Sequence, residues 1–398
     1  MLNNIMEMNH DKCTSCGICE AACPVNAIEI RLNEDGFYQP ILNQEKCISC
    51  GICKKTCIKF NYIEEKMNIL EVYSAKNESK EILKQSSSGG VSYELMKKCI
   101  EKGYMVVGVE YDYNKDISIT SIEKDINKLY KFFGSKYMQS YTVDALKEII
   151  KNSKKDKYAI FGLPCQIFSL KKFAELHKLE ENFIFIDLFC HGCPSLNLWK
   201  KYIEEKKEKL NCKKFDSIEF RTKLYGWHEY SLNFLKGNKN IPSKKTSDEF
   251  FEMFFENNTF NKSCYNCDIR MQFGYSDIRL GDFWGKIYDD DIEGVSAIVI
   301  STKKGQELFG GIKDKFILRD HQIEEVLSSQ SCSKKHIENV KKRNETLKSL
   351  KSDLKIDEIL RIYKKDYSLK KKLKKYIVNF IKENFSKEFI KKLRKLSH

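Results

Sequence analysis

Eight of the sixteen cysteines in this 398-residue chain lie in two nearly identical runs near the N-terminus. Both runs have the spacing Cys-x2-Cys-x2-Cys-x3-Cys, the first beginning at Cys13 and the second at Cys47. Three cysteines on one tight turn and a fourth that points away suit a cube-shaped iron–sulfur cluster, so two copies predict a two-cluster module. Zinc sites usually use two separated Cys pairs, and disulfides need an oxidising compartment, which disfavours both alternatives.

The spacing is that of bacterial ferredoxins, in which the fourth cysteine of each run ligates the other cluster. We therefore expect one 4Fe-4S cluster, the first cluster site, on Cys13, Cys16, Cys19 and Cys57. A second 4Fe-4S cluster, the second cluster site, is expected on Cys47, Cys50, Cys53 and Cys23. Gly17 and Gly51 occupy matching places in the two runs, where the backbone must pass close to the cluster.

Length and composition predict a folded chain of two or three domains, because 398 residues with 41% hydrophobic residues can bury a sizeable core. The N-terminal residues show no secretory pattern, and no apolar stretch approaches the length of a membrane-spanning helix. Cysteines that must stay reduced are typical of the cytoplasm. We therefore expect a cytoplasmic protein without a transmembrane segment.

Positive charge is concentrated at the C-terminal end. Residues 365–398 contain twelve Lys and Arg against three Asp and Glu, which is +9 of the net charge of +14. An apolar stripe with helical spacing runs through the same segment, at Tyr376, Ile377, Phe380, Ile381 and Phe385. The stripe predicts a helix packed on the body of the protein, or a surface that contacts an acidic partner or an anionic membrane. Nucleic-acid binding is not expected, because no motif for it accompanies the charge.

The middle of the chain alternates between helical and strand patterns, which predicts an α/β domain over 70–330. Helices are expected over 91–102, 143–151, 198–208 and 250–256, with Ser195 as a helix cap. Strands are expected over 105–110, 117–122, 158–161, 183–189, 218–221, 230–235 and 295–301. The chain is thus predicted to be α+β: a ferredoxin module over 1–62, the domain over 70–330 with parts of about 70–150 and 155–330, and a Lys-rich helical tail over 331–398.

A second set of cysteines lies in this middle domain. Cys264 and Cys267 form a metal-type pair, and Cys165 and Cys190 each follow a predicted strand. Four thiolates that reach one point from three loops would hold a third 4Fe-4S cluster. The alternatives are a zinc site or separate buried thiols, and Cys193 competes with Cys190 as a ligand.

Several short motifs of the middle domain occur in the order of a known family. They are Ser87-Ser88-Gly89-Gly90, Phe133-Gly134-Ser135-Lys136-Tyr137, Gly162-Leu163-Pro164-Cys165-Gln166, Asp187-Leu188-Phe189-Cys190-His191-Gly192, Phe220-Arg221-Thr222-Lys223, Cys264-x2-Cys267 and Gly281-Asp282-Phe283-Trp284-Gly285. On these motifs, which span about 75–300, the chain resembles the family of coenzyme F420 hydrogenase/dehydrogenase beta subunits. Cys193 departs from the family pattern.

The resemblance implies a domain that binds FAD and one 4Fe-4S cluster. It implies cluster ligands at Cys165, Cys190, Cys264 and Cys267, which we call the third cluster site. It also implies FAD-binding residues at Ser87, Ser88, Gly89, Gly90, Ser135, Lys136, Arg221, Lys223, Asp282 and Trp284. A Ser/Gly run at a helix start offers backbone N–H groups to phosphate, although such a run is also an ordinary helix cap.

The three basic side chains of this set would neutralise phosphate or flavin charge, the alternative being ordinary surface charges. His191 is the candidate catalytic residue, a proton donor near the flavin, the alternative being a structural histidine.

The predicted function is that of an iron–sulfur flavoprotein oxidoreductase. A flavin accepts two electrons together and releases them singly, so clusters beside it are a suitable outlet. The predicted partners are a redox protein or a deazaflavin- or nicotinamide-type carrier, with coenzyme F420 as the name-giving carrier of the family. The alternatives are a ferredoxin-fed reductase of a small molecule or sugar intermediate, for example in polysaccharide biosynthesis, and a non-catalytic electron-relay protein.

Overall fold

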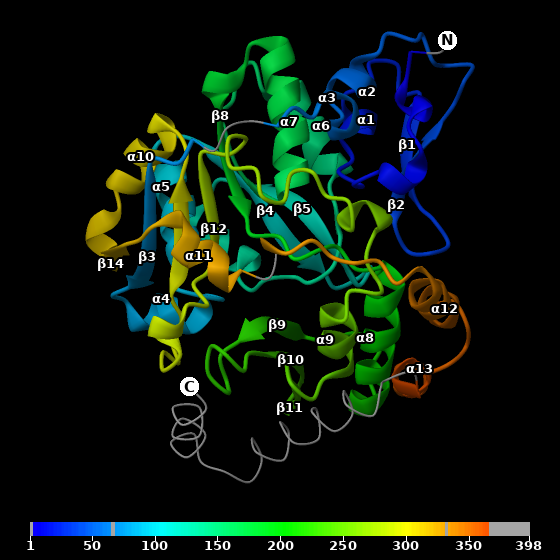
Figure 1. The fold of residues 1–398 in the computed structure, drawn as a ribbon, viewed down its shortest axis with the longest axis vertical. Helices are drawn as coiled ribbons and strands as arrows, with labels where there is room; N and C mark the ends of the chain where they lie inside the picture. The colour runs from blue at the N-terminus through cyan, green and yellow to red at the C-terminus, as the bar shows by residue number, and fades with distance from the viewer. Residues whose placement is uncertain (1–2, 65–67, 331–332, 366–398) are drawn as a thin grey trace.

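The computed structural model describes residues 3–64, 68–330 and 333–365. Its centre is a nine-stranded mixed sheet (Figure 1). The strands are β3 (Glu71–Asn77), β4 (Met105–Asp112), β5 (Ile117–Glu123), β6 (Ser140–Tyr141), β7 (Tyr158–Gly162), β8 (Phe183–Leu188), β12 (Ile278–Asp282), β13 (Ser296–Ile300) and β14 (Phe316–Asp320). Their order is β14-β3-β13-β12-β8-β7-β4-β5-β6. The four strands β12, β8, β7 and β4 run parallel, so their carboxyl ends meet at one edge of the sheet.

Helices cover both faces of this sheet. They are α4 (Lys80–Gln85), α5 (Val91–Glu101), α6 (Val143–Asn152), α7 (Pro164–His177), α10 (Lys303–Gly310) and α11 (Ile323–Ser329). Alternate residues of a strand point to opposite faces. Val106 and Ile186 therefore join the core under α5 and α10, whereas Val107 and Phe185 join the core under α6 and α7. The two buried faces explain why the central strands are apolar at nearly every position.

The N-terminal module packs against α6 and α7. It consists of the hairpin β1 (Ile28–Leu32) and β2 (Tyr38–Leu42) with the short helices α1 (Ile18–Ala21), α2 (Ile52–Lys55) and α3 (Ile58–Asn61). Gly17 and Gly51 precede α1 and α2 with φ of +82° and +73°. This left-handed conformation strains other residues, which accounts for a glycine at the same place in both cysteine runs.

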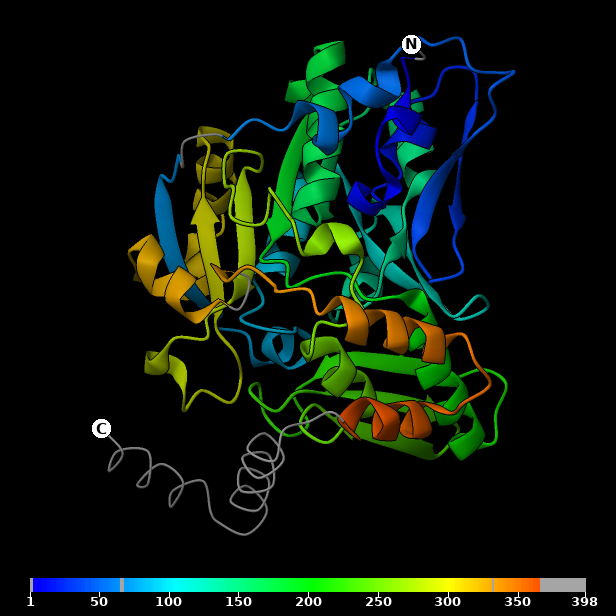
Figure 2. The same ribbon diagram turned by 45° about the vertical axis from the view of Figure 1, so that its right-hand side comes forward.

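A smaller layer lies beside the large sheet (Figure 2). It contains α8 (Leu196–Leu210), α9 (Glu249–Phe255) and the antiparallel sheet of β9 (Ser217–Thr222), β10 (Ser231–Lys236) and β11 (Lys239–Lys244). Helix α12 (Val340–Leu350) packs on α8, and α13 (Ile356–Lys365) packs on α8 and α9. The charged segment over 366–398 lies outside the described residues, so its predicted helix stays a prediction.

The mixed α/β architecture with an N-terminal ferredoxin-type unit agrees with the sequence analysis. The predicted helices and strands of the middle domain occur within two residues of their expected bounds, and Ser195 caps α8 by accepting from the backbone N of Asn197. The sequence patterns do not predict the strands β3, β6, β11, β12 and β14 of this domain. Cys165 follows strand β7, as expected, and lies in the first turn of α7. Among the described residues, no helix combines the length and the apolar character needed to cross a membrane.

Candidate functional site

The first cluster site lies where the N-terminal module meets the large domain. Burial raises the pKa of the Cys19 thiol, and the nearby thiols of Cys16, Cys13 and Cys57 add to this rise. The four sulfurs predicted to share a cluster thus lie close enough to interact electrostatically. Because buried thiolates without a counter-charge are costly, positively charged iron would be needed to stabilise them.

A small cavity lies at the second cluster site. All four cysteines predicted for this cluster line it: Cys23, Cys47, Cys50 and Cys53. Cys50 and the adjacent Ile48 are exposed to solvent. The second cluster site is therefore the one that opens to the surface of the molecule.

The third cluster site draws cysteines from three segments. Cys165 lies in the first turn of α7, Cys190 follows β8, and Cys264 and Cys267 lie in the loop between α9 and β12. Burial raises the pKa of Cys165, and the thiols of the other three cysteines, together with Cys16, raise it further. Segments that are distant in the chain thus converge around Cys165.

Cys193 is a fifth thiol in this region. It is buried, and the thiols of Cys264 and Cys190 contribute to the rise in its pKa. The carbonyl of Cys193 accepts from the backbone N of Asn261 at 2.8 Å, so it ties the Cys190 loop to the Cys264 loop. In the part of the chain that the structure describes, no three His, Cys, Asp or Glu side chains lie close enough together to hold one metal ion. A cubane cluster instead binds its four thiolates through separate iron atoms.

A short polar chain connects the first and third cluster sites. The Sγ atom of Cys16 lies 3.4 Å from Oγ of Ser169, and this hydroxyl donates to the carbonyl of Cys165 at 3.1 Å. Lys59, two residues after Cys57, forms an ion pair of 2.9 Å with Asp268, the residue after Cys267. Side chains of the N-terminal module thus contact both cysteine-bearing segments of the middle domain.

His191 is enclosed rather than exposed at the third cluster site. Its Nε2 atom lies 2.8 Å from Oδ1 of Asn257, and its ring centroid lies 4.9 Å from that of His336. Burial, reinforced by His336, lowers the pKa of His191 to about 4. The imidazole is therefore neutral at neutral pH, and its role as a proton donor stays a prediction.

The Ser/Gly run precedes α5, as expected, but packing accounts for its glycines. A Cβ atom on Gly89 would lie 2.1 Å from the carbonyl oxygen of Ala75 in β3. Gly90 is the N-cap of α5 with φ of +83°. The hydroxyl of Ser87 accepts from the backbone N of Ser135 at 3.1 Å, so the structure brings two of the predicted FAD motifs together.

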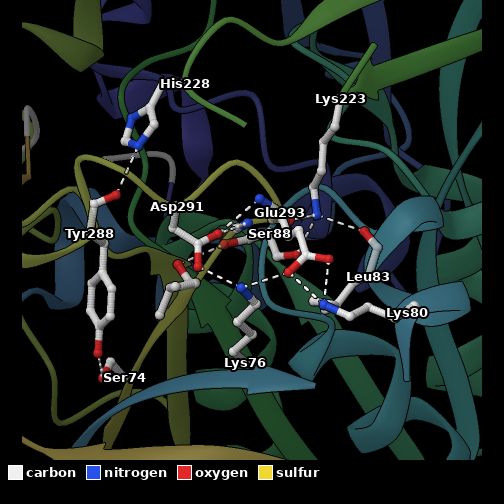
Figure 3. Close-up of polar contacts among 12 residues, drawn as sticks. Ser74, Lys76, Lys80, Leu83, Ser88, Lys223, His228, Tyr288, Asp291 and Glu293 are labelled. Carbon is white, nitrogen blue, oxygen red and sulfur yellow. Dashed lines mark hydrogen bonds and ion pairs between the residues drawn. The ribbon is translucent and has the colours of Figure 1, made fainter. Parts of the chain in front are cut away.

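Lys223 lies between the Ser/Gly run and the loop that joins β12 to β13 (Figure 3). Its Nζ atom donates to the carbonyls of Leu83 at 2.6 Å and Ser88 at 2.8 Å, and to that of Glu293. Burial lowers the pKa of Lys223 to about 8. Lys223 also lines an open cleft of about 630 Å³ with Lys80, Leu83, Lys84, Leu224, Tyr225, Gly226, Ile292 and Glu293.

An acidic loop closes one side of this cleft. Lys76 pairs with Asp291 at 2.6 Å and with Glu293 at 2.8 Å, and Lys80 pairs with Glu293 at 2.7 Å (Figure 3). Lys136, by contrast, donates to the carbonyls of Lys131 and Phe133 within its own loop. Both lysines predicted for FAD thus donate to backbone carbonyls, but only Lys223 of the two also lines the cleft.

Arg221 and Asp282 form a buried pair beside the cleft. The Nη1 and Nη2 atoms of Arg221 donate to the two carboxylate oxygens of Asp282 at 2.9 and 3.0 Å. Trp227 Nε1 donates to the same carboxylate at 2.7 Å, and Trp227 stacks on Trp284 with ring centroids 4.7 Å apart. Arg221, Asp282 and Trp284 are thus assembled in one place. Trp227 and Tyr137, the latter accepting from Arg221 at 3.0 Å, belong to this assembly but are not among the FAD-binding residues predicted from the sequence, although both lie in motifs shared with the family.

Two features of Arg221 indicate a site that a ligand would complete. Its backbone has φ of +59°, a conformation that non-glycine residues rarely adopt and that is concentrated at functional sites. Its Nε atom is buried and has no hydrogen-bond partner among the described residues. A buried donor without a partner is costly, which points to an acceptor that a ligand would supply.

Two family models match the chain. Residues 155–326 match the model for the C terminus of the coenzyme F420 hydrogenase/dehydrogenase beta subunit, and residues 12–60 match the model for the 4Fe-4S dicluster domain. The 155–326 part of the middle domain is therefore similar to coenzyme F420 hydrogenase/dehydrogenase beta subunits, and the N-terminal module is similar to 4Fe-4S dicluster domains of the ferredoxin type. This confirms the resemblance inferred from the motifs.

Individual relatives are more distant. The F subunit of the F(420)H(2) dehydrogenase of Methanosarcina mazei is 27% identical over 197 residues, which cover 46% of this chain and 54% of that protein. The chain thus matches only about half the length of this relative. A chain in the structure titled "Xenon derivatization of the F420-reducing NiFe hydrogenase complex from Methanosarcina barkeri" has a TM-score of 0.46 and 20% identity, covering 78% of this chain and 98% of that chain.

Proposed function

We propose that this protein is an iron–sulfur flavoprotein oxidoreductase that passes electrons between a two-electron carrier and ferredoxin-type 4Fe-4S clusters. The observation that carries the proposal is the convergence of cysteines around Cys165, with Cys16 of the first cluster site among its neighbours. A third cluster on Cys165, Cys190, Cys264 and Cys267 would therefore lie next to the first. Clusters on these thiolates would supply one-electron chemistry, with the chain setting their order and surroundings.

In the proposed order of electron transfer from the flavin, the second cluster site comes last. Cys53 interacts with Cys50 and Cys23 of its own site, and Cys19 of the first site in turn interacts with Cys53. Exposed Cys50 and Ile48 make this site the accessible end of the series. A redox partner protein would exchange electrons there.

FAD fits the residues between the Ser/Gly run and Arg221. The cleft of about 630 Å³ combines lysines with the apolar side chains Leu224, Tyr225 and Ile292, a lining suited to a phosphate-bearing ring system. The unpaired Nε atom of Arg221 would find an acceptor on such a ligand. FAD would be held by Lys223, Arg221, Ser87 and Ser135, and a carrier such as coenzyme F420 would exchange electron pairs with it.

Anaerobic isolation tests this proposal. Three cubane clusters and one flavin predict about twelve irons per chain, four for each cluster, with one equivalent of FAD. Iron and flavin would be determined on the same sample, and the bound flavin titrated with reduced coenzyme F420, NADH and reduced ferredoxin. A chain with about eight irons and no flavin would contradict the proposal, since only the two ferredoxin-type clusters would then be present.

Ser169 should influence the potential of the first cluster. In the structure the Cys16 thiol donates to Ser169 Oγ, and the Ser169 hydroxyl donates to the Cys165 carbonyl. Once Cys16 is a thiolate ligand it no longer donates, and the Ser169 hydroxyl would turn to donate to this sulfur. A hydrogen bond to a cluster sulfur stabilises the more negative, reduced state and so raises the reduction potential. We expect Ser169→Ala to lower the potential of one cluster while the iron content stays unchanged. Redox titration followed by EPR would measure the shift. A Ser328→Ala variant, altered at an exposed serine of α11, is the control and should titrate like the parent protein.

A further inference from the structure

A buried ion pair joins the two central strands that lead into and out of the third cluster site. The strands β8 and β12 are neighbours in the large sheet (Figure 1). Asp187 is the fifth residue of β8 and lies three residues before Cys190, while Arg279 lies in β12, directly opposite Asp187 in the parallel register. The Nε and Nη2 atoms of Arg279 donate to the two carboxylate oxygens of Asp187 at 2.8 and 2.5 Å. The pair is therefore bidentate, the geometry in which arginine fixes orientation as well as charge.

The remaining donors of Arg279 hold the other cysteine-bearing loop. Nη1 donates to the carbonyl of Arg270 at 2.9 Å, and Nη2 donates to the carbonyl of Gln272 at 2.7 Å. Both carbonyls belong to the segment that follows Cys267. Arg270 in turn donates to the carbonyl of Cys264 at 2.7 Å. One guanidinium thus connects the strand that leads to Cys190 with the loop that carries Cys264 and Cys267.

The cost of this arrangement indicates a role other than general stability. The side chains of Arg279 and Asp187 have exposed fractions of 0% and 1%. Removing two charges from water is costly for each ion, and packed apolar residues of similar size often give an equal or more stable fold. An apolar pair, however, could not hold the carbonyls of Arg270 and Gln272. The ion pair is therefore suited to fixing one loop relative to the other.

We propose that Asp187 and Arg279 are positioning residues that set Cys190 relative to Cys264 and Cys267, and thereby the geometry and reduction potential of the third cluster. The inference rests on the proposed function, because it requires a cluster at that site. Neither side chain is proposed as a ligand or as a reacting group. Their effect acts through the backbone segments that carry the cysteines.

The test uses Asp187→Asn and Arg279→Lys in the full chain, isolated anaerobically. Asp187→Asn removes the charge but keeps the shape, and Arg279→Lys keeps the charge but loses the planar fork. We expect the EPR signal and potential of the third cluster to change in both variants, with iron falling from about twelve toward about eight per chain as that cluster becomes labile. The two ferredoxin-type clusters of the same molecules are the internal reference and should keep their signals.

Lys206→Met is the matched control. Lys206 is a buried cation paired with Asp248 at 3.7 Å and Glu249 at 3.3 Å, and it joins α8 to α9 instead of two cysteine-bearing loops. It should lower the melting temperature and leave all three cluster signals unchanged. Unchanged third-cluster signals in Asp187→Asn and Arg279→Lys, with only a lower melting temperature, would overturn the inference.

Loss of all three signals from both variants would also overturn it, because the pair would then support the whole fold. A parent protein with no third-cluster signal would instead contradict the proposed function.

Discussion

The double variant Cys264→Ser, Cys267→Ser is expected to lose about four of about twelve irons, together with all electron transfer from the flavin to the ferredoxin-type clusters. Two of the four proposed thiolates of the third cluster disappear, and serine is a poor ligand for iron–sulfur clusters. The eight cysteines of the two N-terminal runs are unchanged in this variant. Iron analysis and EPR of the reduced protein should therefore show two intact clusters. Flavin reduction by the two-electron carrier should persist, because the proposed flavin site does not contain these residues.

The matched control for this variant is Cys99→Ser. Cys99 is a residue of α5, and its side chain is fully buried in the apolar core that α5 forms with the large sheet. It belongs to none of the three cluster sites, so its replacement should reduce stability without changing the iron content. If the double variant retained about twelve irons per chain and the parent EPR spectrum, the third cluster site would be refuted. If Cys99→Ser lost the same four irons, the loss would reflect destabilisation and not missing ligands.

The cluster cysteines of the N-terminal module are the residues that the sequence predicts most directly. Their spacing is local, and the ligand partners of each cluster follow from the known exchange of the fourth cysteine between the two runs. In the structure, Cys57 lies near cysteines of the first run and Cys23 near those of the second, while the ligand sets themselves stay a prediction. Strong periodicity likewise predicts α5, α6 and the apolar strands β7 and β8.

Long-range strand pairing could not be predicted in the same way. Strand β3 lies between β14 and β13, whose residues follow it in the chain by more than two hundred positions. Such neighbours depend on hydrogen bonds between distant segments, which local patterns do not encode. Asp187 illustrates the limit, because a carboxylate inside an apolar strand signals a buried partner without identifying Arg279.

The candidate flavin residues show a second limit of sequence reasoning. A lysine in a motif predicts a positive charge, but not whether that charge faces a ligand or the backbone of its own protein. Lys136 donates to two carbonyls of its loop, and Gly89 is explained by its close approach to β3. Arg221 is distinguished only in three dimensions, by its left-handed backbone and by the unpaired Nε atom.

Arg221→Met is expected to destabilise the protein by about 3–5 kcal/mol, because it leaves the carboxylate of Asp282 buried without its cation. Asp282 would retain the hydrogen bond from Trp227, which cannot replace a bidentate arginine. The variant should also lose FAD, since Arg221 is proposed to hold it. Thermal unfolding measures the first effect, and the flavin absorbance of the isolated protein measures the second. Arg31→Met, which removes an exposed pair with Glu29, should change neither.

A second substitution separates the two effects of Arg221. In the double variant Arg221→Met, Asp282→Asn, the buried charge is gone and the amide oxygen can still accept from Trp227, so part of the lost stability should return. FAD should nevertheless remain absent, because the guanidinium with the unpaired Nε atom is still missing. If the double variant regained both stability and FAD, Arg221 would serve only to neutralise Asp282, and the flavin site would have to depend on other residues. If stability returned without FAD, Arg221 or Asp282, both of which are predicted to bind FAD, would have a role in ligand binding that their ion pair does not explain, and FAD retained by the single variant Asp282→Asn would assign that role to Arg221.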